Sequence, residues 1–155
     1  MTEKNRLFIA VIGAGKCSRK LRDQAEAIGR GIAEHRAVLV CGGRGGVMEA
    51  AARGARAAGG LTIGILPGND RSDANDYIDI VIPTGIGEAR NMIVIRTADV
   101  VIALPGKFGT LSEMAFSMKM NKPVVSLSAW DISDKIARVD NPEEAVAAAL
   151  RLAEN

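Results

Sequence analysis

The sequence predicts an α/β fold: a Rossmann-like doubly wound parallel sheet with helices on both faces. Short apolar runs alternate along the chain with longer segments in which apolar residues recur every three or four positions. Glycine-rich turns follow several of the apolar runs, at the places where strands of such a sheet lead into helices. The length of 155 residues suits one domain, so residues 1–155 are expected to form a single domain.

Composition narrows the class of protein. Apolar residues make up 48% and charged residues 25% of the chain, which is ordinary for a soluble globular protein. The net charge is only +2, basic residues are scattered and aromatic residues are few, so a nucleic-acid surface is not expected. No apolar run is long enough to span a membrane, and the N-terminus resembles a strand rather than a signal peptide. We therefore expect a cytoplasmic protein without a membrane partner.

The cysteines and the single histidine do not predict a metal site. Cys17 and Cys41 follow the first two predicted strands and are interpreted as reduced thiols, with a functional pair as the alternative. His35 lies where the first helix ends and is interpreted as a charge at that end. Since the chain has no Cys/His cluster, we expect no structural zinc.

The first strand–turn–helix unit spans a strand at residues 7–12 and a helix at residues 21–34. The turn between them, Gly13-Ala14-Gly15-Lys16-Cys17-Ser18, departs from a Walker A loop, which has glycine at the position of Ala10. It also departs from the dinucleotide fingerprint, because no acidic residue follows the second strand. Gly13 and Gly15 suit a tight turn that faces a phosphate, although an ordinary strand-to-helix turn explains them almost as well.

A second glycine-rich loop follows the strand at residues 37–41. Its residues are Gly42, Gly43, Arg44, Gly45 and Gly46. Four glycines exceed what a turn requires, so we interpret the loop as a place where a ligand approaches the backbone; close packing alone is the alternative. The helix that begins at Val47 has small residues on its inner face and is expected to lie very close to the sheet.

The middle of the chain predicts two more strands with a polar loop between them. Gly59-Gly60 ends the preceding helix, and strands are expected at residues 61–66 and 79–82. The loop at residues 67–77 has three aspartates, but their spacing is not that of a calcium loop. We interpret it as a solvated, mobile segment over the mouth of the site.

The helix at residues 88–98 predicts an oligomer. Met92, Ile93, Val94 and Ile95 are consecutive and cover more than a full helical turn, so they cannot all face one sheet. If a second side of this helix is buried in so small a domain, it is expected to contact another subunit. We therefore expect a homodimer or homotetramer whose interface includes this helix. Arg90, near the start of the helix, is expected to point towards the strand ends.

Residues 99–113 are expected to form the floor of the site. A buried strand at residues 100–104 leads through Pro105, Gly106, Lys107 and Gly109 to a helix that is expected to begin at Thr110, with Leu111, Met114, Ala115 and Met118 on its apolar side. A strand, a glycine turn and a helix N-terminus together suit a bound phosphate. Thr110 and Glu113 also match a capping box, in which Glu113 has only a structural role.

The C-terminal part completes the alternating pattern. A strand is expected at residues 123–127, a loop or short helix at residues 128–140, and a helix at residues 142–153 with Asn141 as its N-cap.

The stretch from Pro105 to Glu113 resembles the P-G-G-x-G-T-x-x-E signature of a superfamily. This superfamily includes the LONELY GUY cytokinin-activating phosphoribohydrolases and the molybdenum-cofactor carrier proteins, and its members are often labelled "lysine decarboxylase". Lys107 replaces the second glycine of the signature. Arg90 matches the first residue of the hydrolases' R-K-x-x-M signature, whereas Asn91 and Val94 depart from it. The stretches G-G-R-G-G-V-M-E-A-A and A-R-N-M-I-V-I-R-T-A-D resemble the uncharacterised bacterial, carrier-like branch.

The resemblance implies a small phosphorylated ligand and two possible functions. The carrier-like branch implies that the protein binds a nucleotide or a phosphorylated pterin, such as the molybdenum cofactor, without efficient turnover, and requires no other cofactor. The hydrolases imply the alternative, release of a base from a nucleoside 5′-monophosphate. In that alternative Glu113 and Arg90 are the catalytic residues. Gly106, Gly109 and Thr110 would hold the phosphate.

Overall fold

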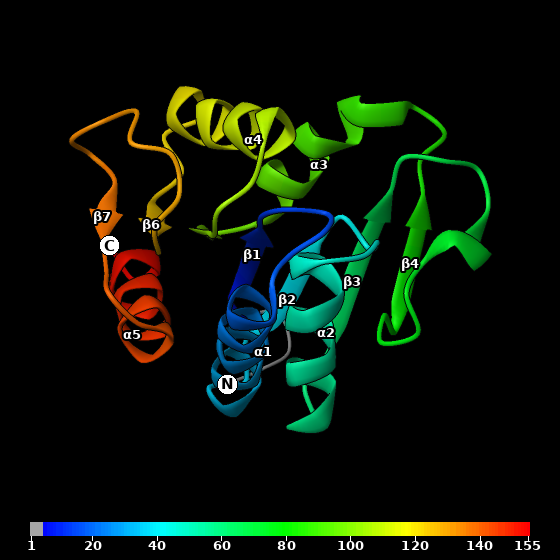
Figure 1. The fold of residues 1–155 in the computed structure, drawn as a ribbon, viewed down its shortest axis with the longest axis horizontal. Coiled ribbons are helices and arrows are strands. Elements are labelled where there is room, and N and C mark those ends of the chain that lie inside the picture. Colours follow the sequence, from blue (N-terminus) through cyan, green and yellow to red (C-terminus); the bar gives the residue numbers. More distant parts are fainter. Residues whose placement is uncertain (1–4) are drawn as a thin grey trace.

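A seven-stranded, entirely parallel sheet forms the centre of the computed structural model, which describes residues 5–155 (Figure 1). The strand order is β4-β3-β2-β1-β5-β6-β7, so the order reverses between β1 and β5. The strands are β1 (Phe8–Ile12), β2 (Val38–Cys41), β3 (Thr62–Leu66), β4 (Ile80–Pro83), β5 (Val100–Ala103), β6 (Val124–Ser126) and β7 (Ala137–Arg138). This confirms the predicted Rossmann-like α/β fold. In such a sheet, ligands bind beyond the carboxyl ends of the strands, where the order reverses.

Five α-helices cover the two faces of the sheet. They are α1 (Arg19–Glu34), α2 (Val47–Ala57), α3 (Arg90–Thr97), α4 (Phe108–Lys119) and α5 (Pro142–Ala153), with short 3-10 turns η2 (Arg71–Asp73) and η3 (Gly87–Ala89). Helices α1, α2 and α5 pack on one face, and α3 and α4 pack on the other. No helix within residues 5–155 is long and apolar enough to cross a membrane.

The central strand β1 is buried on both faces. Ile9 and Val11 belong to the apolar cluster under α1, α2 and α5, while Ala10 and Ile12 belong to the cluster under α3 and α4. All four side chains are buried. This arrangement explains why the strand is a continuous apolar run instead of an alternating one.

Helix α2 packs on the sheet, and its small residues also bring it close to α1. A Cβ atom on Gly54 would lie 2.0 Å from the carbonyl oxygen of Glu26, and one on Gly29 would lie 1.9 Å from that of Ala51. Glycine is therefore required at both positions for the two helices to approach. The closely packed α1–α2 pair lies behind the first two glycine-rich loops.

Helix α4 differs most from the prediction. It begins at Phe108, two residues before the expected start at Thr110, and its N-cap is Lys107 without any side-chain cap. The capping-box interpretation of Thr110 and Glu113 is therefore wrong, because Thr110 already lies inside the first turn. The expected apolar side is confirmed in part: Met114 is buried and Met118 packs against the same apolar cluster, but the other buried residues of the helix are Thr110, Glu113 and Ser117. Its inner side is partly polar because Thr110 and Glu113 line the cavity described below.

The C-terminal region contains one strand that the sequence analysis missed. Residues 128–140 were expected to form a loop or short helix, but β7 lies within them and pairs with β6 through Val125 and Ala137. A strand of two residues is too short to show an alternating pattern. Helix α5 has the predicted bounds, and the side chain of Asn141 accepts a hydrogen bond from the backbone N–H of Glu144.

Candidate functional site

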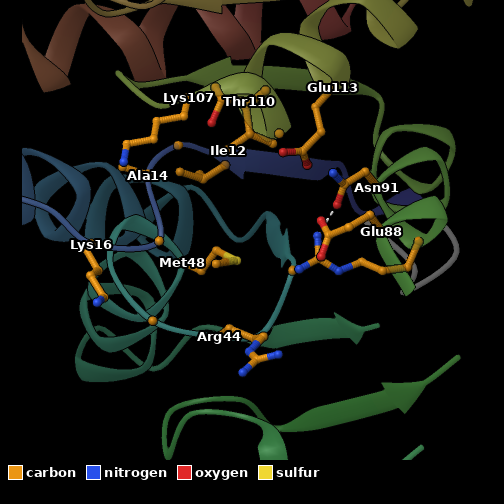
Figure 2. A pocket seen from close by; sticks show the side chains of 17 residues that line it. Ile12, Ala14, Lys16, Arg44, Met48, Glu88, Asn91, Lys107, Thr110 and Glu113 are labelled. Atoms are coloured by element: carbon orange, nitrogen blue, oxygen red, sulfur yellow. Dashed lines mark hydrogen bonds between the residues drawn. The ribbon is translucent and has the colours of Figure 1, made fainter. Parts of the chain in front are cut away.

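A cavity of about 570 Å³ lies at the carboxyl ends of the central strands, where the loops after β1, β2 and β5 meet the start of α3. Figure 2 shows Lys107, Thr110 and Glu113 along one side, with Glu88 and Asn91 at one end. The residues that line the cavity are Val11, Ile12, Gly13, Ala14, Gly15, Lys16, Gly42, Arg44, Gly45, Met48, Glu88, Arg90, Asn91, Lys107, Gly109, Thr110 and Glu113.

The cavity brings together most, but not all, of the candidate site residues. Those that line it are Gly13, Gly15, Gly42, Arg44, Gly45, Arg90, Lys107, Gly109, Thr110 and Glu113. The cavity lining does not include Gly43, Gly46, Pro105 or Gly106. These four residues shape the loops instead. Gly43 and Gly46 have positive φ angles of 78° and 65°. The carbonyl of Pro105 accepts a hydrogen bond from Ala14, and Gly106 packs against Thr110 and Ala14.

The three glycine-rich loops are held together through backbone contacts. The N–H of Ala14 donates to the carbonyl oxygen of Pro105 at 2.9 Å, and the N–H of Val47 donates to the carbonyl oxygen of Ala14 at 2.9 Å. A Cβ atom on Gly106 would lie 2.0 Å from Thr110 Oγ1 and 3.0 Å from the backbone nitrogen of Ala14. Glycine at position 106 therefore allows the loops to pack closely. The sequence had instead suggested that it lets a phosphate contact the backbone.

Arg90 is a buried cation at the end of the cavity. It is the first residue of α3, directly after η3, and only 6% of its surface is exposed. One terminal nitrogen, Nη1, donates to Asn91 Oδ1. Its Nε is buried and has no hydrogen-bond partner within the described residues. A buried donor without a partner carries a desolvation cost, which an acceptor on a ligand would relieve.

Glu113 shares this end of the cavity and is almost completely buried. Burial raises the pKa of its carboxyl to about 8; the positive charge of Arg90 opposes the rise, and Glu88 adds to it. With this pKa, only about one tenth of the carboxyl is ionised at pH 7. Glu113 is therefore mainly a neutral acid in the ligand-free protein, and it can donate a proton or a hydrogen bond.

The charge around the cavity favours an anion. Four cationic side chains line it, from Lys16, Arg44, Arg90 and Lys107, against the two acids Glu88 and Glu113. Helices α2 and α4 start at its edge, and neither has a side-chain cap, whereas Ser18 caps α1 and Asn141 caps α5. Uncapped helix starts leave N–H groups free to bind an anion.

Several lining residues were not singled out as site residues. Asn91 appeared only as a departure from the hydrolase signature, and Lys16 only as part of an incomplete Walker-like turn. Glu88 and Met48 had no sequence signal that separates them from ordinary helix residues. Val11 and Ile12 lie at the end of β1, where the strand order indicates the cavity only once the topology is known.

The polar loop at residues 67–77 does not line the cavity in the described structure. Asn75 holds it to the second glycine-rich loop: its backbone N–H donates to the Gly43 carbonyl at 2.9 Å, and its Nδ2 donates to the Arg44 carbonyl at 2.8 Å.

Within residues 5–155, no three His, Cys, Asp or Glu side chains are grouped so that they could hold a metal ion.

The two cysteines differ in environment. Cys41, at the end of β2, is buried, and burial raises the pKa of its thiol to about 11, against the opposing effect of the Gly43 N–H. This thiol therefore stays protonated at neutral pH and is a poor nucleophile. Cys17 is half-buried, and both thiols are free.

The fold and the cavity place the protein among the Rossmann-like α/β proteins that have a ligand-sized cavity at the strand ends. More specifically, the chain belongs to the SLOG cluster4 family, whose model matches residues 6–154. An uncharacterised protein of Archaeoglobus fulgidus is 44% identical over 138 residues, which are 89% of this chain and 91% of that one. The cytokinin riboside 5′-monophosphate phosphoribohydrolase of Mycobacterium tuberculosis is 33% identical over 72% of this chain, and the match covers 64% of its own length.

Solved structures are similar over nearly the whole chain. The molybdenum cofactor binding protein of Rippkaea orientalis has a TM-score of 0.91 and 37% identity, with 96% of this chain and 98% of that one covered. The molybdenum cofactor carrier protein of Chlamydomonas reinhardtii has a TM-score of 0.90 and 34% identity, with 97% and 100% covered. These matches confirm the resemblance to the superfamily of LONELY GUY and molybdenum-cofactor carrier proteins.

Proposed function

We propose that this protein binds a small phosphorylated molecule, a nucleotide or a phosphorylated pterin such as the molybdenum cofactor, without efficient turnover. The observation that carries the proposal is the buried Arg90 guanidinium, whose Nε has no partner within the described residues and which lies in a cavity lined by four cations. An acceptor atom on the ligand would satisfy this donor, and a phosphate on the same ligand would offset the excess positive charge of the cavity. No further cofactor is required in this proposal.

The size of the cavity supports a ligand of this kind. A volume of about 570 Å³ falls within the usual range of small-molecule sites. The free N–H groups at the start of α4 suit the phosphate, and the opposite end, with Arg90, Asn91 and Glu113, offers donors for a polar heterocycle or a ribose. The ligand would then lie across the strand ends with its two halves in different surroundings.

Two features favour binding over turnover. Glu113 is mainly neutral near pH 7, which weakens its ability to stabilise a positive oxocarbenium-like state. The two structural neighbours named for molybdenum cofactor binding or carriage align with nearly the whole chain at 37% and 34% identity.

The alternative is a nucleoside 5′-monophosphate phosphoribohydrolase. The observation that favours it is that Arg90 and Glu113 line the same cavity, as this chemistry needs. In that reaction water replaces the base at the ribose carbon: the carboxylate stabilises the developing positive charge, and the arginine holds the phosphate or ribose. The identity to the phosphoribohydrolase of M. tuberculosis supports this alternative.

Direct binding and turnover assays separate the two proposals. The purified protein is dialysed against AMP and other nucleoside 5′-monophosphates, and free base is measured over the same period. Binding with no base release above background supports the binding function; the absence of binding to every member of the panel and of any pterin absorbance in the purified protein overturns it. Base release by the wild type that disappears in a folded Glu113→Gln variant establishes the alternative.

We also infer that the protein is a homodimer or homotetramer through residues 88–98. Val94 and Ile95 of α3 are buried in the core, while Met92 and Ile93 on its other side are 36% and 37% exposed. Adjacent apolar side chains on a surface helix favour burial against a second copy of the chain. The mass of the protein in solution tests this inference.

A further inference from the structure

Trp130, the single tryptophan of the chain, binds the loop that leads into α4. Its indole Nε1 donates to the carbonyl oxygens of Gly106 at 3.1 Å and Lys107 at 3.2 Å. Its ring stacks on Phe108, the first residue of α4, with the ring centres 6.3 Å apart and an angle of 20° between the planes. Trp130 is not among the residues that line the strand-end cavity, so it contacts the loop from outside that cavity.

The segment that carries Trp130 is itself well anchored. It follows β6, and the N–H of Ala129 donates to Ser126 Oγ at 3.0 Å. Ser128 has a φ of 61°, in the left-handed region, which turns the chain sharply just before Trp130. The indole is therefore carried by a turn that is tied to the last residue of β6.

Peptide geometry connects these two hydrogen bonds to the cavity. In a planar trans peptide, the carbonyl and the N–H point in opposite directions. The Gly106 carbonyl shares its peptide with the N–H of Lys107, and the Lys107 carbonyl shares its peptide with the N–H of Phe108. Trp130 holds the Gly106 carbonyl on its own side, and it holds the Lys107 carbonyl together with the N–H of Leu111, which donates to the same oxygen at 3.0 Å. The two N–H groups are therefore turned away from the indole.

The N–H groups at the start of α4 are free to meet a ligand. No side chain caps this helix, and the N–H groups of Phe108, Gly109 and Thr110 have no acceptor in the described part of the chain. Lys107, Gly109 and Thr110 all line the cavity. Free donors at an uncapped helix start match the oxygens of a phosphomonoester.

We propose that Trp130 is a positioning residue: it holds the Gly106 and Lys107 carbonyls away from the cavity, so that the N–H groups of the loop and of the first turn of α4 face the ligand's phosphate. This proposal rests on the proposed phosphate-binding function. It predicts that the indole N–H matters for the phosphate half of a ligand and not for the organic half.

The test removes the indole N–H and compares ligands with and without a phosphate. Trp130→Phe keeps an aromatic ring but has no donor. Since the chain has one tryptophan, growth with 3-benzothienylalanine replaces it at this position alone with a ring of nearly the same shape that has sulfur in place of the N–H. Dissociation constants are measured for AMP, adenosine and inorganic phosphate, and hydrogen exchange is measured over residues 105–111 without ligand.

The expected result has two parts. Both altered proteins exchange faster over residues 105–111, and both bind AMP and inorganic phosphate about tenfold more weakly while adenosine binding is unchanged. Unchanged AMP and phosphate binding in both proteins overturns the proposal, as does an equal loss for AMP and adenosine. If the wild type binds neither AMP nor inorganic phosphate, the role of Trp130 toward phosphate is overturned; if it also binds no other nucleoside 5′-monophosphate and shows no pterin absorbance, the proposed function fails as well. Faster exchange in that case still identifies Trp130 as the residue that fixes the loop, so the two failures are distinguishable.

Discussion

The guanidinium of Arg90 lies against the backbone of Gly42. A Cβ atom on Gly42 would be 2.8 Å from both Cζ and Nη2 of Arg90, and 2.7 Å from Sδ of Met48. Because Gly42 has no side chain, the loop after β2 leaves space for the guanidinium of Arg90, which comes from α3. Two segments that are distant in sequence together determine where the positive charge sits in the cavity.

The Gly42→Ala substitution should displace Arg90 and weaken ligand binding. The clashing atoms are the ends of flexible side chains, so the chain can relax at a cost of about 1 kcal/mol in the free energy of unfolding. Because the guanidinium moves, we expect the dissociation constant for AMP to rise about tenfold. Calorimetric titration measures the affinity, and urea unfolding measures the stability.

Gly31→Ala is the matched control for this prediction. Its Cβ atom would lie 2.9 Å from Cγ2 of Val146, an equally tight contact that lies between α1 and α5 and outside the cavity. This variant should bind AMP as the wild type does. An equal loss of affinity in both variants would show that general loosening, and not Arg90, causes the effect.

The Glu113→Gln substitution should change how stability depends on pH. The pKa of Glu113 is about 8 in the folded protein, above its ordinary value of 4.5, so the folded state binds a proton more tightly than the unfolded state. This stabilising contribution is complete below about pH 4.5 and is lost as the pH rises towards 8, by about 1.4 kcal/mol per pH unit at most. Glutamine has no such titration, so the variant should gain stability relative to the wild type between pH 5 and pH 8.

Urea unfolding across this pH range tests the prediction. Glu143→Gln, an exposed position in the first turn of α5, is the control and should leave the pH profile parallel to that of the wild type. If Glu113→Gln also gives a parallel profile, the carboxyl of Glu113 is ionised in the folded protein at neutral pH.

The Lys107→Gln substitution should weaken the binding of phosphorylated ligands. Lys107 is the N-cap residue of α4 and lines the cavity, where the superfamily signature has a glycine. Its charge is partly solvated, so we expect a loss of about three- to tenfold in AMP affinity, smaller at high salt. Lys119→Gln, at the other end of the same helix, should have no effect. Equal affinities for Lys107→Gln and wild type would mean that this lysine points away from the bound ligand.

The Ile93→Glu substitution should reduce the mass of the protein in solution. A charge at this exposed position on α3 would be desolvated in an interface between subunits. Light scattering after size-exclusion chromatography measures the mass. Ile132→Glu, at a similarly exposed position that is 40% accessible between β6 and β7, is the control and should keep the wild-type mass. A wild type that already elutes as a monomer would contradict the predicted oligomer.

The sequence predicted the sheet and most helices because their signals are local. The apolar run in β1 reflects burial on both faces, and Asn141 before Pro142 marks the start of α5. The three glycine-rich loops could be placed at the strand ends for the same reason, since each directly follows an apolar run.

What the sequence could not predict depends on contacts between distant segments. The start of α4 was misplaced because Thr110 and Glu113 imitate a capping box, whereas the hydrogen bond from the Leu111 N–H to the Lys107 carbonyl places Thr110 inside the first turn. The burial of Arg90 depends on the space left at Gly42. The raised pKa of Glu113 depends on its burial, which the sequence does not indicate because the inner side of α4 mixes polar and apolar residues.

The wide spacing of the cavity residues along the chain has a consequence for folding. Val11 and Glu113 line the same cavity although about one hundred residues separate them, and segments between them supply the remaining walls. During synthesis, the cavity is incomplete until α4 has docked on the sheet. A ligand that binds only the assembled cavity would then stabilise the fully folded chain relative to partly folded ones, so only completely folded molecules would carry it.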